Sequence, residues 1–67
     1  MKYFLLTYKI NKMVTKTDFL SYYEAQMSGE FNMVMDAHRV MSIYGIEKNI
    51  YWEIIRNYKK YYNKFIG

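Results

Sequence analysis

The absence of cysteine is the feature that most constrains how this 67-residue chain can fold. A domain this small buries only about 60% of the surface that its unfolded chain exposes, and its net stability is roughly 3–5 kcal/mol at best. Disulfide bonds and thiolate metal sites are excluded, and the single histidine, His38, cannot anchor a structural zinc ion. Stability must therefore come from dense apolar packing or from oligomerisation. The composition favours packing, because the chain has nine Tyr, four Phe and one Trp.

The N-terminal segment has the composition of a β-strand. Residues 2–10 are mostly aromatic, aliphatic or β-branched, which suits a pleated surface. A strand needs a partner for its backbone groups, and two partners are open. One is a return strand at residues 12–15, after a turn near Asn11, and the other is the same strand of a second copy. A helix over residues 1–10 is a third interpretation, which the β-favouring residues oppose.

The apolar run at residues 3–8 is too short for a targeting or membrane segment. A signal peptide needs about 7–15 apolar residues, and a membrane span needs about 20. We therefore expect an intracellular protein of the cytoplasm, with no membrane partner.

Capping signals predict the first helix. Thr15 and Asp18 approximate a capping box, so the helix is expected to begin at Thr15 or Thr17. Apolar residues then recur at helical spacing, and Gly29 is the expected stop.

Two further helices follow in the second half of the chain. Asn32 is a good N-cap for a helix that ends at Gly45. The next helix is expected to begin at Glu47 or Lys48 and to end at Phe65, with an apolar arc wider than a surface helix needs. The predicted core consists of Phe19, Tyr23, Met27, Val34, Ala37, Met41, Tyr44, Tyr51, Ile55, Tyr58 and Tyr62.

Charge is segregated along the chain, whose formal net charge is +4. Residues 1–17 carry four lysines and no acid, whereas residues 18–45 carry four acids and one arginine. Residues 46–67 carry five basic residues and two acids. The basic ends and the acidic middle can attract each other within the fold, or they can attract partners of opposite charge.

The sequence holds no recognisable catalytic motif. Asp18, Asp36 and Glu47 lie near predicted helix starts, where the helix dipole accounts for acidic residues. The serines lack a His–Asp arrangement, and no phosphate loop, dinucleotide fingerprint or metal-ligand spacing occurs. We expect no enzyme activity, no cofactor, no metal site and no small-molecule substrate.

The segment around Gly45 has the spacing of a helix-turn-helix, with this residue as the turn glycine. Met41 stands four residues earlier, where a small residue is usual, and Glu47 would face phosphates unfavourably. The apolar positions of the motif would be Val40, Ile46, Tyr51 and Ile54.

The C-terminal segment alternates basic and aromatic residues. Such a segment can contact phosphates and stack bases, but its tyrosines can equally form the core while its lysines face solvent. Tyr61 distinguishes these two interpretations, because it lies off the main apolar stripe and need not belong to the core. The candidate contacts are Arg56, Lys59, Lys60, Tyr61 and Lys64.

The acidic middle offers candidate contacts to a protein partner. Glu24, Glu30 and Asp36 can cover the basic groove of a nucleic-acid-handling factor. Met35 lies off the predicted apolar stripe and is the best candidate for an exposed methionine contact.

A short motif before the second predicted helix carries a resemblance. Ser28, Gly29, Asn32 and Met33 form a Ser-Gly-x-x-Asn-Met turn. Over residues 19–62 the chain resembles small bacteriophage-encoded helical proteins with this turn. Most of these proteins have no known function, so the resemblance implies a phage or mobile-element setting and no particular activity.

Together these patterns predict one domain over residues 1–67 with a mainly α (α+β) fold, an N-terminal strand or short hairpin followed by a three-helix bundle. The first functional hypothesis is a non-catalytic phage-type inhibitor that binds a host protein, for example a nucleic-acid-handling or defence factor. The second is a DNA-binding, helix-turn-helix-like regulator that uses the basic third helix. The third is a homo-oligomeric structural protein paired through residues 2–10.

Overall fold

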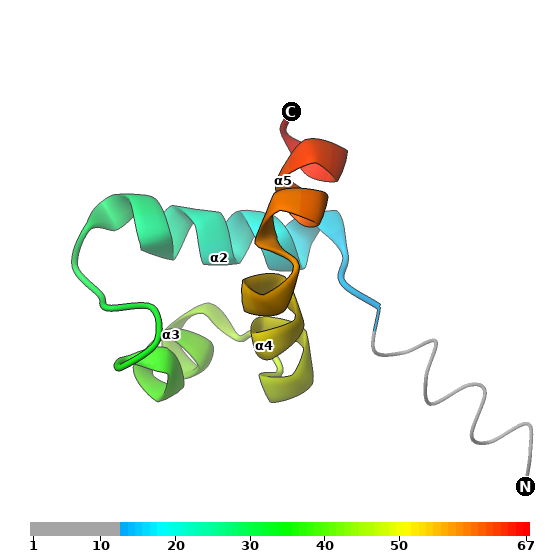
Figure 1. The fold of residues 1–67 in the computed structure, drawn as a ribbon. Helices are drawn as coiled ribbons and strands as arrows, with labels where there is room; N and C mark the ends of the chain where they lie inside the picture. Colours follow the sequence, from blue (N-terminus) through cyan, green and yellow to red (C-terminus); the bar gives the residue numbers. More distant parts are fainter. Residues whose placement is uncertain (1–12) are drawn as a thin grey trace, which may run out of the picture.

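A computed structural model describes residues 13–67, which form four helices and no strand. The prediction of a mainly α fold is confirmed for this part of the chain (Figure 1). The strand predicted at residues 2–10, and the pairing of two copies through it, lie outside the described residues. The helices are α2 (Lys16–Ser28), α3 (Ala37–Tyr44), α4 (Lys48–Arg56) and α5 (Tyr58–Phe65).

The start of α2 is fixed by the capping box that the sequence predicted. The hydroxyl of Thr15 accepts a hydrogen bond from the amide of Asp18 at 3.1 Å, and the carboxylate of Asp18 accepts one from the amide of Thr15 at 3.1 Å. A return strand at residues 12–15 is therefore wrong for residues 13–15, because Thr15 caps the helix and Val14 packs into the core. Gly29 ends α2 with a φ of 73°, as predicted.

Removing the cap is expected to weaken the fold measurably. Thr15→Ala should lower the free energy of unfolding by about 1 kcal/mol, because one amide of the first turn loses its acceptor. Thr17→Ala is the matched control, since Thr17 is exposed and lies inside the helix. Urea denaturation followed by circular dichroism measures both variants. Equal losses in the two variants would contradict the role of Thr15.

The second helix begins later than the sequence predicted. Asn32 does cap, with its side-chain oxygen accepting from the amides of Val34 and Met35 at 3.0 and 2.9 Å, but it caps a turn over residues 33–36. The helix itself begins at Ala37, whose amide donates to Val34 and not to Met33. The carbonyl of Met33 instead accepts a hydrogen bond from the Tyr51 hydroxyl at 2.7 Å. The Met33 carbonyl thus bonds to a residue 18 positions away and not to the Ala37 amide, as it would in a helix that began earlier.

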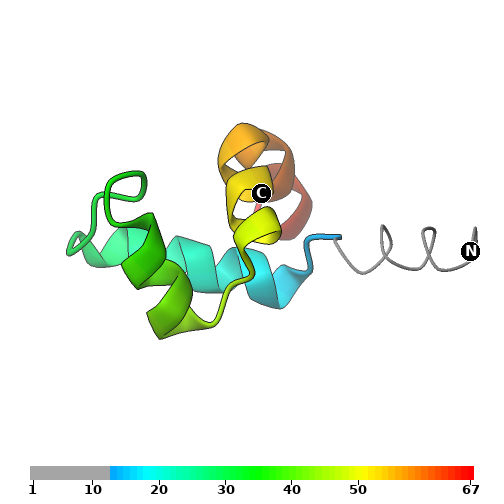
Figure 2. The ribbon, with the colours of Figure 1, turned by 90° about the horizontal axis from the view of Figure 1, so that it is seen from below.

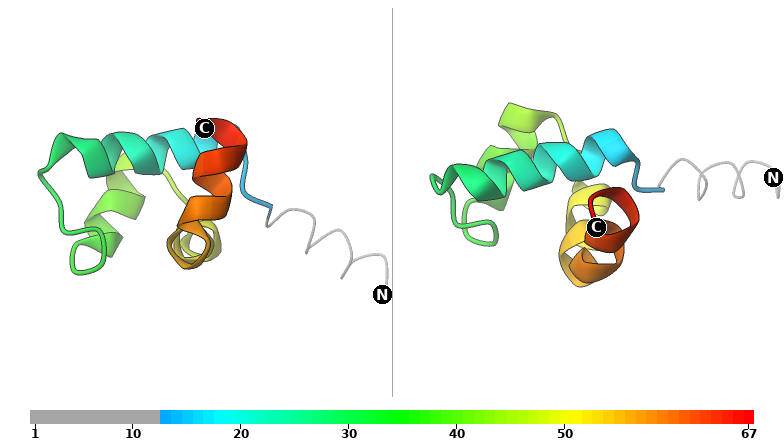
Figure 3. Two further views of the ribbon diagram at one scale, coloured as in Figure 1. Left: turned by 45° about the horizontal axis from the view of Figure 1, so that its top comes forward. Right: turned by 90° about the horizontal axis from the view of Figure 1, so that it is seen from above.

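The prediction of a single third helix is wrong, because the structure has two helices in this segment. The segment is divided at Asn57, whose φ of −126° and ψ of 39° are not helical, into α4 and α5. The Asn57 side chain donates to the carboxylate of Glu53 at 2.9 Å, which links the residue at the bend to the preceding turn of α4. The left view of Figure 3 looks nearly along α4 while α5 runs across it, so the two helices point in different directions.

α2 contacts each of the other three described helices. Figure 2 shows it running through the molecule, with α3 and the α4–α5 pair against different parts of it. The largest fully buried side chains are Tyr51, Phe19, Ile54 and Val40. The ring of Phe19 lies 5.4 to 6.5 Å from the rings of Tyr23, Tyr58, Tyr62 and Phe65. Aromatic packing of this density is what the cysteine-free composition predicted.

The predicted core is right in part. Phe19, Ala37, Met41 and Tyr51 are buried, but Met27 and Val34 are wrong, being 59% and 60% exposed. Val34 lies in the capped turn, and Met27 lies in the last turn of α2. The predicted core residues that are only partly buried are Tyr23, Tyr44, Ile55, Tyr58 and Tyr62. The buried residues that the predicted list omitted are Val14, Tyr22, Ala25, Val40, Ile46, Ile50, Ile54 and Tyr61.

Buried tyrosines are expected to make the fold sensitive to alkali. Burial, and then the proximity of Tyr22 and Asp36, raises the pKa of Tyr51 from 10.0 to about 12. The pKa of Tyr51 is higher in the folded chain than in the unfolded chain. The contribution of the neutral Tyr51 side chain to folding stability is therefore complete below about pH 10 and is lost as the pH rises towards 12. Circular dichroism should show loss of helix over that range. The Tyr51→Phe variant cannot ionise at this position, so its free energy of unfolding should fall less between pH 10 and 12 than that of the unaltered protein. An equal fall in the two proteins would contradict this role of Tyr51.

Candidate functional site

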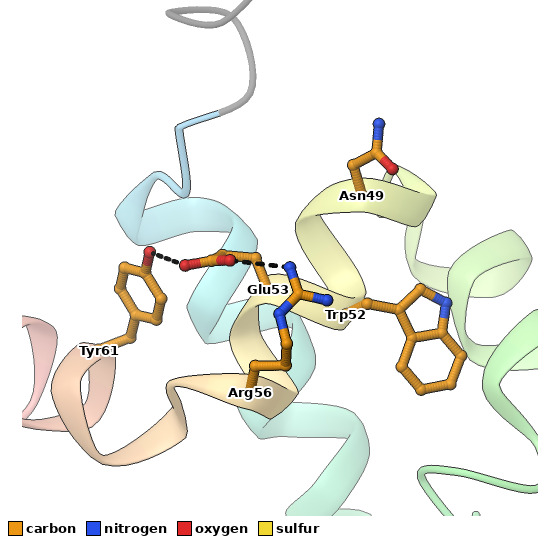
Figure 4. A pocket seen from close by; sticks show the side chains of 5 residues that line it. All are labelled: Asn49, Trp52, Glu53, Arg56 and Tyr61. Carbon is orange, nitrogen blue, oxygen red and sulfur yellow. Dashed lines mark hydrogen bonds and ion pairs between the residues drawn. The ribbon is translucent and has the colours of Figure 1, made fainter.

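The surface of α4 and α5 contains an open hollow of about 430 Å³. We call it the Trp52 hollow, and Figure 4 shows its lining. Four of its residues share one face of α4, because their spacing of three, one and three positions matches the helical repeat. Ile50 and Ile54 occupy the buried face of the same helix. The lining residues are Asn49, Trp52, Glu53, Arg56 and Tyr61.

Glu53 is the centre of a hydrogen-bond network that joins α4 to α5. One carboxylate oxygen accepts from the Arg56 guanidinium at 3.0 Å, and the other accepts from the Tyr61 hydroxyl and the Asn57 amide at 2.9 Å each. The hydrogen bond from Tyr61 is the largest cause of the lowered pKa of Glu53, and the bonds from Arg56 and Asn57 lower it further. Glu53 is therefore an anion whose charge is offset by three donors.

Trp52 and Arg56 present their side chains to the hollow. Trp52 is half-buried, and its indole stands edge-on to the Tyr51 ring with centroids 5.5 Å apart. The Arg56 side chain is 65% exposed, although it pairs with Glu53. In Figure 4 the guanidinium group lies between the Glu53 carboxylate and the Trp52 indole. An aromatic surface and a cation thus border the same space.

Beside the hollow, α5 has a basic outer side. Its sequence holds three lysines and no acid, and all three are exposed. The ammonium groups of Lys60 and Lys64 lie 5.3 and 5.4 Å from the ring centroids of Tyr61 and Phe65. We call Lys59, Lys60 and Lys64 the lysine side of α5.

The candidate contacts of the C-terminal segment separate into two groups. Arg56 and the lysine side of α5 are exposed, as a binding role requires. Tyr61 is only 7% exposed and donates its hydroxyl hydrogen to Glu53. Tyr61, the residue that distinguishes stacking from core packing, therefore belongs to the core, and the candidate contact at this position is wrong as an exposed stacking ring.

The acidic candidates lie on α2 and on its connection to α3, and none of them lies on α5 (Figure 1). Glu24 and Glu30 are exposed, and Met35 is 82% exposed. Asp36 is engaged within the fold, since it accepts from the amide of Asn32 at 2.9 Å and lies 3.9 Å from the Arg39 guanidinium. Its position is explained by the turn that it closes.

The helix-turn-helix spacing is matched by the burial pattern. Gly45 has a φ of 68°, and three residues separate α3 from α4. Glu47, Lys48 and Asn49 at the start of α4 are exposed. The four apolar positions of the motif, Val40, Ile46, Tyr51 and Ile54, are all buried.

Sequence reasoning missed three residues of the hollow, namely Asn49, Trp52 and Glu53. A signal was present, because these residues and Arg56 are spaced as one face of a helix. The wide apolar arc predicted for this segment concealed that spacing, because Trp52 could be taken for another aromatic residue of the arc.

Within residues 13–67, no group of histidine or acidic side chains is arranged to hold a metal ion. No helix in this same part of the chain is long and apolar enough to span a bilayer. Comparisons with known protein families, with curated proteins and with solved structures found no match to this chain.

Proposed function

We propose that this protein is a non-catalytic nucleic-acid-binding protein that contacts phosphates through Arg56 and the lysine side of α5. The observation that carries the proposal is the composition of this surface: four exposed cations, with no acid on α5. Phosphate contacts by Lys and Arg supply most of the sequence-independent affinity for nucleic acids. The aromatic residues of α5 pack against the core, and its three lysines are exposed to solvent.

The acidic residue nearest to this surface is consistent with such binding. Glu53 would repel a phosphate if it were unpaired, but three donors engage its carboxylate. Arg56 keeps most of its side chain exposed while it pairs. The Arg56–Glu53 ion pair is therefore close to neutral, and the lysine side of α5 provides the net positive charge of this surface.

Fluorescence anisotropy of a labelled oligonucleotide tests the proposal with the full chain. We expect binding at micromolar protein and about 50 mM salt, and a steep loss of affinity as salt rises. The absence of any binding under these conditions would refute the proposal.

A second candidate function is binding to a host protein, as a phage-type inhibitor or modulator. Large exposed apolar residues on α2, on α3 and on the connection between them favour it: Met27, Val34, Met35 and Ile43 are 59–82% exposed. Affinity purification from nuclease-treated lysate would compare the chain with its Met35→Glu variant. A stoichiometric partner that the variant loses supports this candidate, and no partner for either chain counts against it.

A further inference from the structure

We infer that the Trp52 hollow binds one unpaired nucleobase, so that the protein favours single strands over duplex. This inference rests on the proposed function and names the form of nucleic acid that the surface recognises. It is carried by the side chains around the hollow, which combine an indole, a guanidinium and an amide.

The hollow has the size and chemistry of a base site. Its volume of about 430 Å³ falls in the range of small-molecule sites, roughly 300–1,000 Å³. Trp52 provides an aromatic surface for stacking, which tolerates any base because every base has a π-face. The Asn49 amide can both donate to and accept from a base edge, and the planar Arg56 guanidinium can stack or donate.

The hollow is continuous with the lysine side of α5. Tyr61 lines the hollow, and the ammonium group of Lys60 lies 5.3 Å from the centroid of the same ring. A phosphate held at Lys60 would therefore bring an adjoining base of the same strand to the hollow. Backbone contact and base contact are thus placed side by side on one surface.

An unpaired base fits this surface better than a duplex does. In a duplex each base is stacked between its neighbours, so its face cannot reach an indole that is half-buried in a hollow.

The only tryptophan of the chain provides a direct readout. The full protein would be titrated with oligothymidylate, with an abasic oligonucleotide of equal length, and with duplex DNA. We expect anisotropy to detect binding of all three, with oligothymidylate about tenfold tighter than the abasic strand, the gain of one stacked base. Only oligothymidylate should quench Trp52 strongly.

The outcomes separate the two proposals. If no oligonucleotide binds, the proposed function fails, and the inference fails with it. If the abasic strand binds and quenches as oligothymidylate does, or if duplex binds more tightly, the inference fails while nucleic-acid binding stands.

Trp52→Ala tests the same contact by affinity. We expect it to lower the affinity for oligothymidylate to that for the abasic strand while leaving the abasic affinity unchanged, and Trp52→Phe should restore part of the difference. The abasic affinity also checks that the surface remains folded. A fall of both affinities by the same factor in a variant whose circular dichroism is unchanged would overturn the base site.

Discussion

Phe19→Ala is expected to unfold most of the protein at room temperature. The Phe19 side chain is fully buried, and its ring contacts aromatic residues of both α2 and α5. Truncation of a buried phenylalanine costs about 3–5 kcal/mol, from lost burial and from the cavity that remains. A chain of this size has a net stability of roughly the same magnitude. Circular dichroism of the variant should therefore show little helix and no cooperative thermal transition.

The neighbouring residue provides the control for this prediction. Leu20 is 40% exposed, so Leu20→Ala should leave the helix signal intact and lower the free energy of unfolding much less. Phe19→Leu keeps most of the apolar volume and should give an intermediate result. A cooperative transition in Phe19→Ala close to that of the unaltered protein would show that the aromatic cluster is not the main source of stability.

The start of α2 and the ends of α2 and α3 were predictable from the sequence because their causes are local. The box formed by Thr15 and Asp18 involves residues three positions apart, and Gly29 and Gly45 take positive φ values that other residues rarely adopt. The sequence could not predict where α3 begins, because the hydroxyl of Tyr51 reaches the carbonyl of Met33 only in the folded chain. Such contacts depend on how the helices pack.

The bend at Asn57 accounts for most of what the sequence missed. On one straight helix, Tyr51, Ile55 and Tyr58 form the central stripe, and Tyr61 lies beside it. Once the helix bends, Tyr61 enters the core, and Ile55 and Tyr58 are only partly buried. Two independently oriented helices bury two different faces.

The candidate surface was also predictable only in part. Its cations are visible in the sequence, because charged side chains stay exposed in nearly any fold. The Trp52 hollow requires α4 and α5 to meet at an angle, with Glu53 joining them through Tyr61. Charge was therefore a better guide than aromatic content to the position of this surface.

Lys59→Glu/Lys60→Glu is expected to abolish oligonucleotide binding at micromolar protein. The change reverses two of the four cations that the proposal places against phosphates. At about 50 mM salt, where each lysine–phosphate contact contributes roughly tenfold, affinity should fall by at least about 100-fold. Both positions lie in the first turn of α5, where the helix dipole favours acidic side chains, so the fold should persist. Anisotropy measures the affinity, and circular dichroism checks the helix content.

A charge-swapped variant separates a local surface from overall charge. Adding Glu24→Lys and Glu30→Lys to the double variant restores the formal net charge of +4 but places the new cations on exposed positions of α2 and the α2–α3 connection. If phosphates bind Arg56 and the lysine side of α5, this variant should still fail to bind, because its new cations lie on α2 and on the α2–α3 connection and not on α5. Binding restored to within a few-fold would instead mean that net charge alone attracts the nucleic acid. The surface assigned to α5 would then have no specific role.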